Sequence, residues 1–145
     1  MQAVLHILVP VDGSLHSDRA VAQAVKLASA GKNRIDLLYV AYFDQATDDA
    51  VTKISWLPGS VTGSTGKLSR TILQRAAALI PPEIEQTQQV RTGIPAKEIL
   101  AFAQTQAVNL IVVGARGLGR VEGFLLGSVS QELLEQAPCA VLVVK

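Results

Sequence analysis

The sequence contains little of the side-chain chemistry on which many enzymes depend. It has one cysteine, Cys139, and two histidines, His6 and His16, among 145 residues. A lone cysteine cannot form an internal disulfide, and the chain has no Cys/His cluster that could bind a metal. We expect His6 in the core or on a sheet face, His16 exposed at the start of a helix, and Cys139 packed as a small apolar residue.

The chain also lacks a strong charge and long hydrophobic runs. Its formal net charge is +1, which gives no general attraction to nucleic acids or acidic membranes. No apolar run reaches the ~18 residues of a transmembrane helix. The first residues lack the basic and then apolar pattern of a signal peptide. We therefore expect a cytoplasmic protein that binds neither nucleic acid nor membrane.

What the chain does contain is apolar residues, at 49% of the total, enough to form one core. We expect residues 1–145 to be a single domain. Runs of apolar or β-branched residues predict strands at 4–11, 35–40, 83–92, 110–113 and 140–144. Amphipathic spacing predicts helices at 21–28, 68–79, 95–106 and 128–136, the last with both Leu133 and Leu134 inward. A further short helix is possible at 48–55.

This alternation predicts an α/β fold with a five-stranded parallel sheet covered by helices on both faces. The strand at 83–92 is rich in glutamine, which favours an edge of the sheet. Ligands of such sheets bind where the winding direction reverses. The strand order 3-2-1-4-5 places Pro10-Val11-Asp12-Gly13 beside Gly114-Ala115-Arg116-Gly117, with Val40 flanking them.

Glycines and serines after the fourth strand favour a phosphate site. Gly114 and Gly117 are followed by Gly127 and Ser128, which precede a helix whose N-terminus offers unpaired N–H groups. Ser128 also begins a capping-box pattern that ends at Gln131. The run 114–120 has the glycine spacing of a P-loop, but Arg120-Val121 replaces the required Lys-Ser/Thr. The run 117–123 resembles a dinucleotide fingerprint but lies too late in the chain.

The chain resembles the UspA-type universal stress proteins. The resemblance is carried by Ile7-Leu-Val-Pro-Val-Asp-Gly-Ser14 and by the closing segment 137–144. It is also carried by the spacing G-x2-G-x9-G-[ST], which Gly114, Gly117, Gly127 and Ser128 satisfy. It implies an adenine nucleotide alpha-hydrolase-like fold that binds ATP, which Mg²⁺ usually accompanies, and assembly into homodimers.

The resemblance also implies a role for each residue of the site, with no catalytic residue and no metal ligand among them. Pro10, Val11 and Asp12 would hold the adenine and ribose side, and the backbone of Val40 would contact adenine. The residues under the ribose and phosphates would be Gly114, Arg116 and Gly117, and those receiving the phosphates Gly127, Ser128, Val129 and Ser130.

Two segments carry further expectations. Residues 43–66, which include Trp56, have no clear family counterpart and would form either a lid over the nucleotide or a mobile connection. The final strand, Ala140–Val144, is apolar and lies at an edge of the predicted sheet. Exposed edges of this kind pair with other strands. We therefore expect a homodimer joined through this strand.

Three functions are compatible with these observations. The favoured one is an ATP-binding stress-response or signalling module with little or no hydrolysis, because the histidines are expected far from the site. A slow ATPase or nucleotidyl-transfer enzyme would need a glycine-serine loop after the first strand or paired histidines at a helix start. A dimeric interaction module without nucleotide is disfavoured by the intact glycine spacing.

Overall fold

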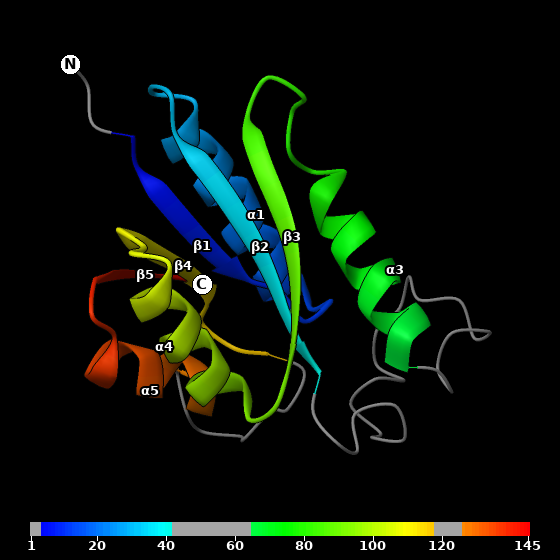
Figure 1. The fold of residues 1–145 in the computed structure, drawn as a ribbon, viewed down its shortest axis with the longest axis vertical. Helices are drawn as coiled ribbons and strands as arrows, with labels where there is room; N and C mark the ends of the chain where they lie inside the picture. The colour runs from blue at the N-terminus through cyan, green and yellow to red at the C-terminus, as the bar shows by residue number, and fades with distance from the viewer. Residues whose placement is uncertain (1–3, 42–64, 118–125) are drawn as a thin grey trace.

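Strands and helices alternate along the chain (Figure 1). The computed structural model describes residues 4–41, 65–117 and 126–145. The strands are β1 (His6–Pro10), β2 (Arg34–Ala41), β3 (Glu85–Thr92), β4 (Leu110–Gly114) and β5 (Ala140–Val144). The helices are α1 (Leu15–Ala28), α3 (Thr65–Ala77), α4 (Pro95–Thr105) and α5 (Ser128–Gln136). The short helix expected at 48–55 lies outside the described residues.

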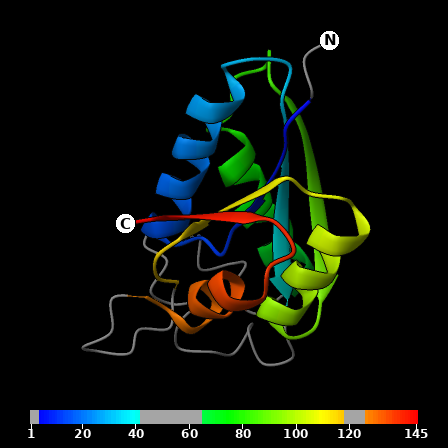
Figure 2. The ribbon, with the colours of Figure 1, turned by 90° about the vertical axis from the view of Figure 1, so that its left-hand side faces the viewer.

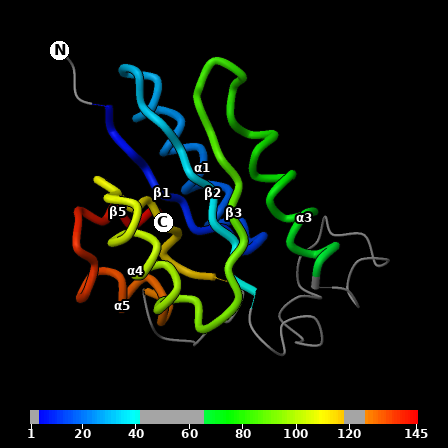
Figure 3. The backbone as a smooth tube through the Cα atoms, in the orientation of Figure 1, coloured from blue at the N-terminus to red at the C-terminus, as the bar shows by residue number. Residues whose placement is uncertain are grey.

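The five strands form one parallel sheet in the order β3-β2-β1-β4-β5, which confirms the expected topology. The polar strand β3 is at one edge, and every one of its residues is exposed or half-buried. It runs beside β2 along its whole length (Figure 3). The apolar strand β5 forms the other edge.

The helices form a layer on each face of the sheet (Figure 2). Side chains alternate along each strand, so Ile7 and Val9 pack in one core cluster with residues of α1 and α3, while Leu8 packs in the other with residues of α4 and α5. The helices thus bury the apolar runs of β1, β2 and β4 from both sides, as is typical of a parallel sheet.

Local signals set where the helices begin. Ser14 is the N-cap of α1, and its hydroxyl accepts a hydrogen bond from Ser17 N–H at 3.1 Å. Pro95 occupies the first turn of α4, where its missing N–H costs nothing. One expectation for α5 is wrong in part. Leu133 is fully buried, but Leu134 is 47% exposed.

Candidate functional site

The chain turns sharply between β1 and α1, at the carboxyl edge of the sheet. Gly13 has a φ of +88°, a conformation that favours glycine. The carboxylate of Asp12 accepts a hydrogen bond from Ser14 N–H at 2.9 Å through Oδ1. This bond fixes the half-buried Asp12 side chain at the end of β1.

Gly117 lies against Asp12, although the two residues belong to different strand-helix connections. A Cβ atom on Gly117 would stand 2.5 Å from Asp12 Oδ2. The structure therefore brings the two expected loops together, and it does so through a contact that only glycine permits.

Gly114 makes a second close approach, to the first turn of α1. Its added Cβ would lie 2.7 Å from the carbonyl carbon of His16 and 2.8 Å from His16 Cβ. His16 is half-buried, and its Nδ1 is buried without a hydrogen-bond partner in the described part of the chain. The expectation that His16 is exposed and far from the site is therefore wrong, because the close packing of β4 on α1 covers it.

The N-terminus of α5 is the third part of the site. Gly127 is its N-cap, with no side-chain cap hydrogen bond, and Gly127 N–H donates to the Ala115 carbonyl at 2.6 Å. A Cβ on Gly127 would lie 3.4 Å from Arg116 Cα and 3.6 Å from Gly117 N. The start of α5 and the loop after β4 are therefore in contact.

The capping-box interpretation of Ser128 is wrong. Ser128 is the first residue of α5, and the N-cap position belongs to Gly127, which has no side chain to cap the helix. The hydrogen bond from Gly127 N–H to the Ala115 carbonyl holds the N-cap one residue earlier than the capping-box pattern predicts, while the helix itself has the expected bounds. Ser128 itself is exposed.

Strand β2 extends past the end of β1 at this edge. The last bond of the β1–β2 ladder runs from Val11 N–H to the Leu38 carbonyl at 2.9 Å. Backbone groups of successive residues point to alternate sides of a strand, so those of Val40 also face the β1 side. The Ala41 carbonyl faces β3 and accepts from Gly93 N–H at 2.9 Å. The N–H and C=O of Val40 are thus directed at the space beyond β1.

The remaining expected residues differ in how much of their surface is exposed. Val11 is 4% exposed and packs in the core with α1, so its contribution is limited to its backbone. Pro10, Arg116 and Val129 are half-buried. Arg120 lies outside the described residues, as does most of the segment 43–66.

Sequence reasoning missed a buried polar cluster at the amino-terminal end of the sheet. Asp36 is 2% exposed. Its Oδ2 lies 2.5 Å from His6 Nε2, and its Oδ1 accepts a bond from Thr87 Oγ1 at 2.6 Å and lies 3.4 Å from Arg34 Nε. The expected core position of His6 is confirmed. The available signal was a lone aspartate in an apolar strand, since buried carboxylates need partners.

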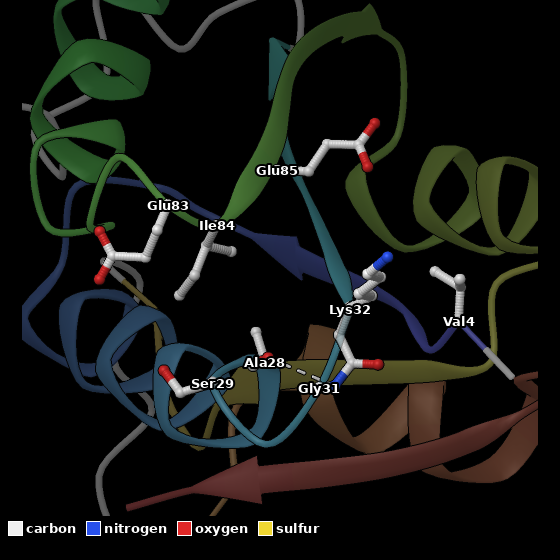
Figure 4. A pocket seen from close by; sticks show the side chains of 9 residues that line it. Val4, Ala28, Ser29, Gly31, Lys32, Glu83, Ile84 and Glu85 are labelled. Atoms are coloured by element: carbon white, nitrogen blue, oxygen red, sulfur yellow. Dashed lines mark hydrogen bonds between the residues drawn. The ribbon is translucent and has the colours of Figure 1, made fainter. Parts of the chain in front are cut away.

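A cavity of about 510 Å³ lies near the same end of the sheet, between the end of α1 and the turn that leads into β3 (Figure 4). Lys32, Glu83 and Glu85 supply its charges, and all three side chains are exposed. Exposed charges are solvated, so this hollow has no buried charged group to select a ligand. It contains none of the residues expected to bind nucleotide.

In the ranges 4–41, 65–117 and 126–145, no three His, Cys, Asp or Glu side chains are grouped so as to hold a metal ion. Over the same ranges, no helix is long and apolar enough to cross a membrane.

Comparison with known proteins places this geometry in one family. The model of the universal stress protein family matches residues 4–145. Universal stress protein YxiE of Bacillus subtilis is 32% identical over 144 residues, which cover 96% of this chain and 97% of YxiE. The structure of UspA from Lactobacillus plantarum has a TM-score of 0.73 and 26% identity, with full coverage of both chains.

Some solved structures of the same fold contain adenine nucleotides. A universal stress protein in complex with cAMP has a TM-score of 0.67 and 24% identity over 99% of this chain and 98% of its own. Two others, from Archaeoglobus fulgidus and Arabidopsis thaliana, contain dAMP and AMP. The family match over residues 4–145 and the shared fold lead to one conclusion: this chain belongs to the universal stress protein family.

Proposed function

We propose that this protein binds an adenine nucleotide, ATP above all, at the carboxyl edge of its sheet. It would act as a nucleotide-dependent stress-response or signalling module in the cytoplasm. The observation that carries the proposal is the start of α5, where Gly127 provides no side-chain cap and touches the loop after β4. The N–H groups of Ser128, Val129 and Ser130 lie at the positive end of the helix dipole, which favours phosphate.

The other side of the site suits a nucleoside. The adjacent N–H and C=O of Val40 match the acceptor and donor on one edge of adenine. The carboxylate of Asp12 can accept hydrogen bonds from ribose hydroxyls, whereas it would repel a phosphate. The adenine nucleotides in the neighbouring structures support this assignment.

We expect little or no hydrolysis. A general base must reach the attacking water and be free to take its proton. Among the described residues of this site, Asp12 would face the ribose rather than the terminal phosphate that the water attacks, and His16 Nδ1 is buried. Mg²⁺ would enter with the triphosphate and keep several of its waters. Its ligands would then be phosphate oxygens rather than a dedicated cluster of side chains.

The proposal is tested by identifying nucleotide released from the denatured protein by mass spectrometry, and by titrating ATP with Mg²⁺ in a calorimeter. In Gly127→Val the backbone is extended, at φ −74° and ψ 166°, which valine can adopt, and its bulk beyond Cβ would press on the loop after β4, where Arg116 Cα lies 3.4 Å from the Cβ position. Binding should be lost in this variant. It should survive in Gly66→Val, where an added Cβ has nothing within 4 Å.

Two results would overturn the proposal. If the wild type binds no adenine nucleotide, the site does not have this function. If it turns over ATP within seconds to minutes, the protein is an enzyme rather than a binding module.

We also propose a homodimer joined through β5. This strand is an edge of the sheet, and its residues Val141 to Val144 are only half-buried. Ala115 N–H donates to the Val144 carbonyl, so the backbone groups of Val144 face β4 and those of Val143 face outward. The outward groups are available for pairing with a second copy.

The alternation of backbone groups supplies a matched pair of variants for this interface. Val143→Pro removes an outward N–H and should give a folded monomer in analytical ultracentrifugation. Leu142→Pro removes a bond to β4 and should destabilise the fold instead. A wild-type protein that is monomeric at micromolar concentration, or an unchanged dimer in folded Val143→Pro, would contradict the interface.

A further inference from the structure

The hydroxyl of Ser130 is already engaged within the protein. Ser130 is 2% exposed. Its Oγ lies 2.9 Å from the Ala115 carbonyl oxygen and 3.0 Å from the Gly127 carbonyl oxygen. A hydroxyl has one proton, which these two carbonyls share. The remaining lone pairs on Oγ can only accept, and phosphate oxygens are acceptors too.

The peptide groups of Ala115 are where three parts of the chain meet. Its N–H donates to the Val144 carbonyl at 2.7 Å. Its carbonyl accepts from Gly127 N–H at 2.6 Å and from the Ser130 hydroxyl. Ala115 is 3% exposed, so water cannot replace these bonds easily. The end of β5, the loop after β4 and the start of α5 are therefore fixed to one another through one buried residue.

The second acceptor of Ser130 lies in the first turn of α5. The Gly127 carbonyl receives Gln131 N–H at 3.1 Å, the first hydrogen bond of the helix, together with the Ser130 hydroxyl. The Ser130 hydroxyl thus stabilises the first turn of α5 from within and also links this turn to the loop after β4. This arrangement orients the N–H groups at the helix start before any ligand is present.

We propose that Ser130 is a positioning residue of the nucleotide site, and that its hydroxyl does not contact phosphate. It joins the loop after β4 and the first turn of α5 into one preformed unit. Phosphate would be bound by the backbone N–H groups of this turn and by the exposed hydroxyl of Ser128. This inference rests on the proposed nucleotide function and states how the site is organised.

The two possible roles of Ser130 differ in which ligands they affect. A direct phosphate contact matters only for ligands that carry phosphate, and its loss leaves the ligand-free protein unchanged. A positioning role matters for adenosine too, because the loop that Ser130 fixes leads to Gly117, which lies against Asp12. It also alters the protein when no ligand is bound.

The experiment compares Ser130→Ala, Ser130→Thr and Ser130→Cys with Ser128→Ala. Amide hydrogen exchange of the ligand-free proteins is followed by NMR at Ala115 and Gly127. These two amides should exchange faster in Ser130→Ala than in the wild type. Their exchange in Ser130→Thr should equal that of the wild type. In Ser130→Cys the rate should be intermediate, because a thiol is a weak donor. Ser128→Ala should not change them.

Calorimetry with ATP, AMP and adenosine supplies the second measurement. Ser130→Ala should weaken all three by the same factor, roughly three- to tenfold for one lost hydrogen bond, and threonine should restore them. Ser128→Ala should weaken ATP and AMP and leave adenosine unchanged.

A loss confined to ATP and AMP, with unchanged exchange in ligand-free Ser130→Ala, would overturn the positioning role. If the wild type binds none of the three ligands, the nucleotide function fails, while the exchange rates still decide whether Ser130 organises this loop. If Ser130→Ala does not fold, the comparison of Ser130→Cys with Ser130→Thr provides the same test.

Discussion

The carboxylate of Asp12 occupies the space where a side chain on residue 117 would begin, with Oδ2 2.5 Å from the Cβ position of Gly117. The absence of a side chain on Gly117 therefore sets the orientation of Asp12. Because Asp12 Oδ1 also accepts a bond from Ser14 N–H, the carboxylate is held on two sides.

We expect Gly117→Ala to lower nucleotide affinity with little effect on stability. The new methyl group would displace the Asp12 carboxylate, which is the end of a flexible side chain and can rotate away. Rotation would break the bond to Ser14 and remove the proposed ribose acceptor, which should weaken ATP binding about tenfold. Calorimetric titration and thermal unfolding of the same samples check this. Unchanged affinity in a folded Gly117→Ala protein would contradict the role of Asp12.

Gly114→Ala should act mainly on the stability of the fold. Here the new Cβ would meet backbone and Cβ atoms of His16 at 2.7 to 2.8 Å, and these cannot rotate away. The end of β4 and the first turn of α1 must separate, which should lower the free energy of unfolding by about 1–3 kcal/mol. Urea denaturation measures this cost. Gly66→Ala is the control, because its Cβ has nothing within 4 Å and alanine favours a helix.

Asp36→Ala should destabilise the fold and leave nucleotide binding intact. It strips partners from His6, Arg34 and Thr87. The expected loss is about 2–3 kcal/mol, less than for a fully buried ion pair because the Arg34 side chain is 34% exposed and can be rehydrated. Denaturant titration should show Thr87→Val costing about 1 kcal/mol, since it removes one bond. A large loss of ATP affinity in Asp36→Ala would place the cluster in the site.

The stability of the protein should depend on pH through Asp18. Burial raises the pKa of the Asp18 carboxyl above its ordinary value of 3.8. The Arg75 guanidinium, whose nearest nitrogen lies 3.8 Å from Asp18 Oδ2, lowers this pKa, and the nearby carboxylate of Asp12 raises it further. The folded protein therefore holds this proton at pH values where the unfolded chain has lost it. The contribution of Asp18 to the free energy of unfolding therefore falls as pH rises from 3.8 through the raised pKa, and the loss persists above it.

Asp18→Asn removes this dependence. Its stability relative to wild type should increase as pH rises through that interval and then stay level, as measured by denaturant titrations at a series of pH values. Glu135→Gln, on the exposed side of α5, controls for the loss of one negative charge. A relative stability that decreases over the same interval would show that the bond to Arg75 outweighs burial.

The sequence was sufficient to predict the sheet, because its buried strands are short apolar runs and its polar strand can only lie at an edge. It also predicted that the loops after β1 and β4 meet. It predicted the bounds of α5 but not its N-cap, since the Gly127 N–H bonds to the carbonyl of Ala115, which lies in another part of the chain. The partners of Asp36 could not be predicted either, because His6 and Thr87 lie 30 and 51 residues away from it in the chain.

The position of β1 in the middle of the sheet has a consequence for how the protein is made. β1 pairs with β2, which follows it closely, and with β4. Just before β4, 103 residues further along the chain, the Asn109 side chain accepts a hydrogen bond from His6 N–H. A nascent chain that has emerged only as far as β3 can form the first three strands but none of the loop containing Gly117. A nucleotide bound at the proposed site could therefore not assist the early steps of folding during synthesis, and it would stabilise the protein only after the last two strands have left the ribosome.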